Sequence, residues 1–317
     1  MKRFNFLLAI AILALAPFLG QIDLNLLDIL DTSSSSHMLF WELRAPRVLI
    51  AFFSGAILSL AGLVFQILFR NPLTTPFTLG VASGATLGTA IAIVFFSEIV
   101  FWQYTFSFIG ALLTVFVLFL ISRSLKTTQT NSLLLVGVAL SFFYSAALMV
   151  LFFLSDFSQS YSIVRFTMGS LNIIGFDVVY PIVAASLLLL TTIHFYRKEL
   201  KLLLASLDFA FLKGIEVSKI TMILLLLTSL AIAVCVSVVG PIGFVGLIVP
   251  HIIKTLYQKS SDQLILPTFF YGGTFLVFCD LVSRNLGASS DIPIGVITSF
   301  LGGPFFIYLI LHRNRGH

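Results

Sequence analysis

The feature that most constrains this chain is the repetition of apolar stretches about as long as a membrane is thick. Hydrophobic residues make up 59% of the 317 positions and charged residues only 10%. A helix that rises ~1.5 Å per residue needs about 20 residues to cross ~30 Å of hydrocarbon. Such stretches cover approximately residues 4–22, 47–68, 77–101, 104–122, 131–154, 177–196, 219–239, 240–257, 264–283 and 292–312. The sequence therefore predicts an all-α, polytopic membrane protein with about ten transmembrane helices.

The few basic residues sort by the side of the membrane on which they would lie. If the N-terminus lies inside, fourteen of the 18 Lys and Arg residues fall on the cytoplasmic side. Lys and Arg in short loops favour that side, so both termini are predicted to be cytoplasmic. Because these residues occupy short loops and form no continuous stripe, no nucleic-acid partner is expected. The four outer exceptions are Arg44, Arg47, Arg165 and Arg284.

The apolar stretches leave no segment long enough for a soluble domain, so residues 1–317 are expected to form one membrane domain. Cys235 and Cys279 both lie within apolar stretches, without the spacing of a disulfide framework or a metal site. His251 also lies within such a stretch and is interpreted as a structural histidine rather than an iron ligand. No metal site and no catalytic arrangement of side chains is predicted.

Glycines at fixed intervals predict where helices pack closely. The two groups are Gly80, Gly84 and Gly88, and Gly240, Gly243 and Gly246. The first group makes two Gly-xxx-Gly steps, which let helix backbones approach in lipid. The second surrounds Pro241 and predicts a break between two crossings, while Gly302-Gly303-Pro304 predicts an interruption of the last one. Broken helices in a membrane are either packed in protein or line a cavity, and both explanations stay open here.

An ordered set of motifs resembles the membrane permeases of ABC importers for iron chelates, haem and cobalamin, over essentially the whole chain. The motifs are Arg44-Ala45-Pro46-Arg47, Gly55, Gly62, Gln66-Ile67-Leu68-Phe69-Arg70-Asn71-Pro72-Leu73, Pro76, Leu79-Gly80-Val81-Ala82-Ser83-Gly84-Ala85, Met168-Gly169-Ser170-Leu171, Gly240-Pro241-Ile242-Gly243-Phe244-Val245-Gly246-Leu247-Ile248-Val249-Pro250-His251, Asp280-Leu281-Val282-Ser283-Arg284 and Ile292-Pro293-Ile294-Gly295-Val296-Ile297-Thr298.

The resemblance implies a multi-pass subunit of the bacterial inner membrane that works within a larger assembly. Two copies would pair around a central pathway in the lipid bilayer. Two ABC ATPase subunits would bind on the cytoplasmic face, and a periplasmic or lipoprotein substrate-binding protein would deliver substrate from outside. The chain contains no Gly-xxxx-Gly-Lys-Ser/Thr phosphate loop, so ATP and Mg²⁺ are expected in the partner ATPase and no cofactor in this chain.

The resemblance also assigns roles to two sets of residues. Arg44, Arg47 and Arg284 would face acidic residues of the binding protein, whose carboxylates the planar guanidinium fork suits. Arg165 has no counterpart and is interpreted as a helix-end arginine. Within the cytoplasmic segment 197–218, here termed the coupling segment, two short helices with Gly214 at the turn between them would seat in the ATPase. The residues assigned to this contact are Leu207, Asp208, Phe209, Ala210, Phe211, Leu212, Lys213, Gly214 and Ile215.

The sequence thus predicts a transport subunit, not an enzyme, with an iron(III) chelate of the siderophore or citrate type as the leading substrate. Cobalamin, haem or another metal complex is the alternative within the class. An ion-coupled secondary transporter would carry charged residues in mid-membrane, whereas the charges here gather at helix ends. Asp280 lies near an outer helix end, one turn before Arg284, and the two side chains are expected to pair.

Overall fold

The computed structural model describes residues 2–22, 24–96, 100–124, 130–258, 260–286 and 291–313, and within these ranges its regular structure is helical. Each of the ten predicted stretches coincides with a helix. These helices are α1 (Lys2–Leu15), α3 (Ala45–Leu68), α4 (Val81–Phe95), α5 (Val100–Ser124), α6 (Thr130–Leu154), α8 (Val179–Phe195), α11 (Val217–Val239), α12 (Val245–Tyr257), α13 (Ser261–Leu286) and α14 (Ile294–Arg313). Shorter elements between them are η1 (Leu26–Asp28), α2 (Ser35–Met38), the π-helical η2 (Leu39–Arg44), α7 (Phe157–Thr167), α9 (Arg197–Ala205) and α10 (Leu207–Leu212).

Length and hydropathy confirm a polytopic membrane protein. Among the described residues, five helical spans are long and apolar enough to cross a bilayer, and α8 with α9, bent by 62°, makes a sixth if the pair is one span. Apolar helices of 10–17 residues occupy the four remaining predicted stretches. A helix therefore lies at each of the ten predicted crossings, but the number of helices that span the membrane stays a prediction.

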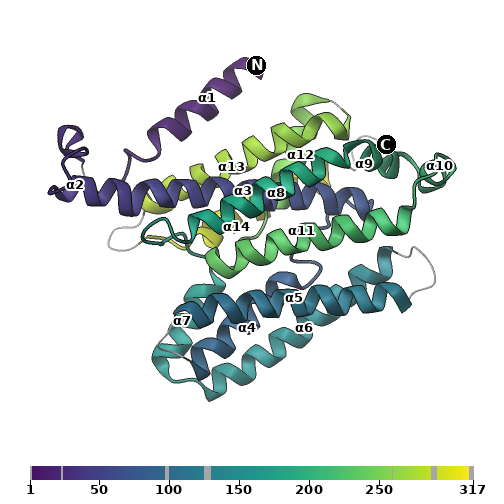
Figure 1. Ribbon diagram of the computed structural model, residues 1–317, viewed down its shortest axis with the longest axis horizontal. Coiled ribbons are helices and arrows are strands. Elements are labelled where there is room, and N and C mark those ends of the chain that lie inside the picture. The colour runs from purple at the N-terminus through teal and green to yellow at the C-terminus, as the bar shows by residue number, and fades with distance from the viewer. Residues whose placement is uncertain are drawn as a thin grey trace.

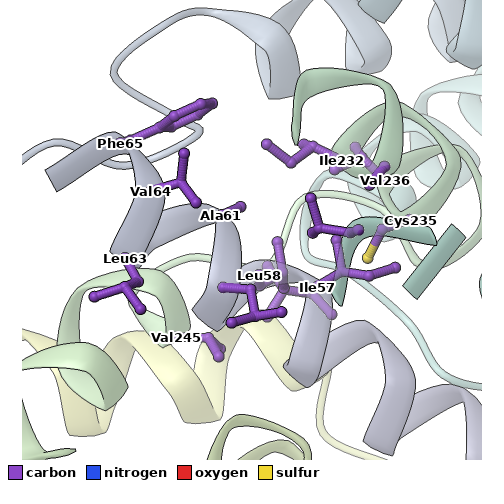
Figure 2. Close-up of a cluster of buried hydrophobic side chains, with 14 of the residues drawn as sticks. Ile57, Leu58, Ala61, Leu63, Val64, Phe65, Ile232, Cys235, Val236 and Val245 are labelled. Carbon is purple, nitrogen blue, oxygen red and sulfur yellow. The ribbon is translucent and has the colours of Figure 1, made fainter. Parts of the chain in front are cut away.

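Helix α3 forms the centre of the larger helix layer (Figure 1). It packs against α8, α11, α12 and α13, and nearly all of its side chains from Ser54 to Leu68 are buried. Figure 2 shows Ile57 and Ala61 of α3 on the side of Ile232 and Val236 of α11, and Leu58 on the side of Val245 of α12. A helix that is apolar all round is typical of such a core position. Cys235 and Cys279, predicted to be unpaired, are both free and buried.

Helices α4, α5, α6 and α7 form a second group beside this layer (Figure 1). Here the predicted small-residue face packs α4 closely against α5. A Cβ on Gly84 would lie 2.7 Å from the carbonyl oxygen of Gly110, and one on Gly88 would overlap the Phe106 carbonyl. Gly80 has φ +76° and begins α4 beside Gly137 of α6. By contrast, only 11% of the apolar window of α6 is buried.

The two predicted helix breaks have different outcomes. Gly240, with φ +72°, ends α11, and α12 begins only at Val245, as the sequence predicts. The interruption predicted at Gly302-Gly303-Pro304 is wrong, because α14 runs through these residues without a break. A membrane helix tolerates an internal proline where neighbouring protein packs around it, and Gly302 lies directly against the ring of Phe244.

The connecting elements separate to the two ends of the helices (Figure 1). Helices α2 and α7, in segments predicted to lie outside, are at one end, whereas α9 and α10, in the coupling segment, are at the other. Helix α2 lies in the connection between α1 and α3. The arrangement places the predicted outer and cytoplasmic contact surfaces at opposite ends of one bundle.

Candidate functional site

A cavity of about 1020 Å³ opens between the two groups of helices, and we call it the central cavity. Its walls come from the segment after α3, from α4 and α6, from the end of α7, and from the starts of α12 and α14. None of the described residues that line it is charged. The polar groups are the hydroxyls of Thr75, Thr78, Ser83, Thr86, Tyr144, Ser145, Thr167 and Ser299.

The central cavity extends along the predicted direction of transport. At one end it reaches Leu73 and Thr75, which follow α3 on the predicted cytoplasmic side. At the other end it reaches Thr167 and Gly295, on the predicted outer side. Apolar and hydroxyl side chains offer contact area and hydrogen bonds, as in ordinary ligand pockets, and among the described residues they bring no charge. Gly243, one of the regularly spaced glycines around Pro241, lies in this wall, and a Cβ built on it would meet open space.

At the predicted outer end, four charged side chains form what we call the outer charge cluster: Arg47, Asp280, Arg284 and Asp291. Arg47 donates through Nε to Oδ1 of Asp280 at 2.8 Å and through Nη1 to Oδ2 of Asp291 at 2.5 Å. The expected Asp280–Arg284 pair is confirmed, with 3.0 Å between Oδ2 and Nε. The side chain of Asp280 is fully buried, so its charge is compensated almost entirely by these two guanidinium groups.

Backbone carbonyls of the α1–α2 connection complete the bonding of the outer arginines. Arg44 donates to the carbonyl oxygens of Phe18, at 2.9 Å, and of Ile22. Arg284 donates to those of Ala16 and Leu19, at 3.2 and 3.3 Å. These bonds attach the end of α1 to α3 and α13.

The three arginines predicted to dock a binding protein are thus brought together, but they are turned inward in this conformation. Arg44 and Arg284 are each 6% exposed, and Arg47 is bonded to Asp280, Asp291 and Asn172. Direct docking through them would require an incoming carboxylate to exchange with an internal partner. Their docking role stays a prediction. Arg165 lies in the last turn of α7, at a helix end as expected.

At the predicted cytoplasmic end, the coupling segment presents apolar side chains to its surroundings. Phe209, Phe211 and Leu212 of α10 are 46%, 74% and 80% exposed, whereas Leu200 and Leu203 of α9 are buried. An exposed apolar patch on a short helix outside the apolar stretches is typical of a surface that contacts another protein or the membrane interface. The side chains of Leu207 and Asp208 lie outside the described residues.

The predicted geometry of this segment is corrected in one detail. The two short helices are α9 and α10, and they join at Ser206, whose backbone is extended (φ −162°, ψ 137°) and whose hydroxyl caps α10. Gly214, with φ +79°, makes its turn after α10, not between the two helices. Serine fits the junction because its side chain accepts from the amide of Phe209 and so starts the second helix.

A polar contact between α3 and α12 was not predicted. The Nζ of Lys254 donates to Oε1 of Gln66 at 3.1 Å, and Nε2 of Gln66 donates to the Gly246 carbonyl at 3.1 Å. Gly246 also contacts Gly62 closely enough that a Cβ on either residue would crowd the other backbone. His251 lies edge-on to the ring of Phe305. Gln66 belongs to the motif Gln66–Leu73 that carries the resemblance. Nothing in a single sequence, however, indicates that its side chain pairs with Lys254, 188 positions away.

A polytopic helical bundle with an uncharged lining of its central cavity among the described residues, and an exposed short helix α10 at one end, fits a membrane permease. The chain belongs to the FecCD transport family, which matches residues 7–312. This is the family of ABC importer permeases that the motifs indicate, and its members are transport subunits rather than enzymes.

Relatives match over nearly the whole chain. The hemin transport system permease protein HmuU of Yersinia pestis is 34% identical over 98% of this chain and 95% of its own length. The probable iron chelatin transport system permease protein of Helicobacter pylori is 35% identical over 89% of this chain and 85% of its own. A solved structure described as an inward-facing metal-chelate type ABC transporter has a TM-score of 0.88 and 28% identity, covering 98% of this chain and 100% of that one.

Proposed function

We propose that this chain forms the translocation pathway of a binding-protein-dependent ABC importer for an iron(III) chelate. The observation that carries the proposal is the central cavity of about 1020 Å³ with its uncharged lining. This volume is at the upper end of the roughly 300–1,000 Å³ of ordinary ligand pockets. A metal already wrapped in an organic chelator presents a bulky, mixed apolar and polar surface, which hydroxyl and apolar walls suit.

The proposed topology has ten crossings of the bacterial inner membrane with both termini in the cytoplasm. The asymmetry of Lys and Arg supports it, because the reverse orientation would place fourteen of 18 basic residues outside. The grouping of α9 and α10 at the end opposite α2 and α7 agrees with the alternation of the connections (Figure 1).

The proposed assembly contains a second copy of this chain, two ABC ATPase subunits and a substrate-binding protein. A second copy would close the open side of the central cavity, and α6, with 11% of its apolar window buried, leaves ample surface for a partner or lipid. ATP and Mg²⁺ would be bound by the ATPase. Closure of the two ATPases would move α10 and rock the helices between outward- and inward-open states.

The experiment is ATP hydrolysis by the purified complex of this chain, its ATPase and its binding protein in nanodiscs. Hydrolysis is measured with the binding protein empty or loaded with an iron(III) siderophore, iron(III) citrate, haem or cobalamin. We expect the largest stimulation with an iron(III) chelate. If only haem or cobalamin stimulated ATP hydrolysis, that compound would be the substrate instead of an iron(III) chelate, and the class of transporter would stand. Absence of any ATPase association would contradict the class.

A further inference from the structure

The residue that follows the C-cap of α3 adopts a backbone conformation that its side chain disfavours. Arg70 has φ +48°, in the left-handed region, directly after the C-cap Phe69. Glycine is the usual residue at this position because it lacks a Cβ. A non-glycine residue held in such a conformation is a reason to look for a function of its side chain.

The side chain of Arg70 reaches the coupling segment. Its Nε and Nη2 both donate to the carbonyl oxygen of Leu203, at 3.3 and 2.8 Å. Leu203 lies in the last turn of α9, and the extended backbone of Ser206 removes the amide that a continuing helix would offer this carbonyl. A cation at a helix C-terminus also complements the helix dipole. Arg70 therefore caps α9 at the bend where α10 begins.

The other attachments of α9 constrain this bend less directly. The side chains of Leu200 and Leu203 are buried, which fixes the face of α9 but not the direction in which the chain leaves it. Lys201 and Asp262 of α13 are 3.6 Å apart, but their side chains are 54% and 25% exposed, so their pairing is screened by water.

Arg70 also stands at the end of α3, whose apolar window is 83% buried. Helix α3 carries Arg70 just beyond its cytoplasmic end and Arg47 of the outer charge cluster near its other end. We propose that Arg70 is a positioning residue that holds the bend between α9 and α10 to α3, so that movement of the coupling segment is transmitted to the core. The proposal rests on the proposed function only for its transport consequence; the mechanical link is testable in the permease alone.

Three variants separate the side chain from the backbone. Arg70→Gly relieves the left-handed strain while removing the guanidinium fork, and Arg70→Lys keeps the charge without the fork. Gln258→Gly is the matched control, because Gln258 is also a left-handed residue (φ +46°) that ends a helix in a predicted cytoplasmic loop. The first readout is hydrogen–deuterium exchange of the α10 amides in the permease alone in nanodiscs. We expect exchange about tenfold faster in Arg70→Gly, in line with loss of a charged hydrogen bond, and unchanged exchange in the control.

The second readout is uptake per ATP hydrolysed in the full complex. We expect Arg70→Gly to lower this ratio about tenfold while hydrolysis persists, with Arg70→Lys between it and the wild type. Unchanged hydrogen–deuterium exchange of α10 in Arg70→Gly would show that Arg70 does not hold the bend. Faster exchange with unchanged uptake per ATP would show that the bend does not transmit movement to the core. If the wild-type complex itself shows no ATP-driven uptake, the proposed function fails, while the exchange experiment still decides the link.

Discussion

Replacing Asp280 with asparagine removes the negative charge that two inward-facing arginines share. Its carboxylate lies 2.8 Å from Arg47 and 3.0 Å from Arg284, and its side chain is fully buried. Breaking a buried pair by removing one partner costs about 3–5 kcal/mol, because an uncompensated charge is left behind. Asp291, which also pairs with Arg47, is 25% exposed, so water screens its interaction and Asp291→Asn should cost about 1 kcal/mol or less.

The assay is thermal unfolding in nanodiscs, followed with a thiol-reactive fluorophore that labels the two buried cysteines as the bundle opens. At roughly 2–4 °C per kcal/mol, Asp280→Asn should lower the midpoint by roughly 6–20 °C. The double variant Asp280→Asn/Arg284→Gln should lose less than the two single losses added together, because the pair is already broken. A midpoint for Asp280→Asn within 2 °C of that for Asp291→Asn would refute the argument from burial.

Three further predictions test packing, pathway and coupling. Gly62→Ala should destabilise the bundle by about 1–3 kcal/mol, because its Cβ would overlap the Gly246 carbonyl, whereas Gly303→Ala meets open space and should be neutral in the same unfolding assay. Ser299→Arg places a charge in the wall of the central cavity and should abolish chelate uptake, while Ser299→Ala should not. Phe211→Glu should weaken ATPase binding at least about tenfold in a pull-down titration without lowering the unfolding midpoint, because this ring is 74% exposed.

One result would contradict each of these three predictions. Equal midpoints for the two alanine variants would mean that α3 and α12 are not in close contact at Gly62. Full uptake by Ser299→Arg would remove the central cavity from the pathway. ATPase binding by Phe211→Glu at wild-type strength would remove α10 from the contact surface.

The sequence alone predicted the positions of the apolar helices and one interaction within a single helix. Each apolar stretch near 20 residues coincides with a helix of the described residues, because the bilayer demands both length and hydrophobicity. The pair Asp280–Arg284 was predictable since four residues make about one helical turn. The break at Gly240 followed from glycine and proline together, both poor residues for a helix interior.

The sequence alone did not predict contacts between segments that are distant in the chain. Arg47 meets Asp291 across 244 positions and Arg70 meets Leu203 across 133, and no periodicity in the chain encodes either pairing. The resemblance led us to expect that the outer arginines face a partner, and their docking role stays a prediction; charge at a helix end indicates a membrane boundary but not the direction of the side chain. The interruption predicted at Pro304 failed for a related reason, since packing around a helix decides whether it tolerates a proline.

Uptake of a radiolabelled iron(III) chelate into proteoliposomes that contain this chain with its ATPase and binding protein is the most decisive measurement of the proposed function. We expect accumulation that requires ATP and the loaded binding protein together, and that is lost when the ATPase is omitted. Uptake by this chain alone, driven by a proton or sodium gradient, would contradict it and identify a secondary transporter.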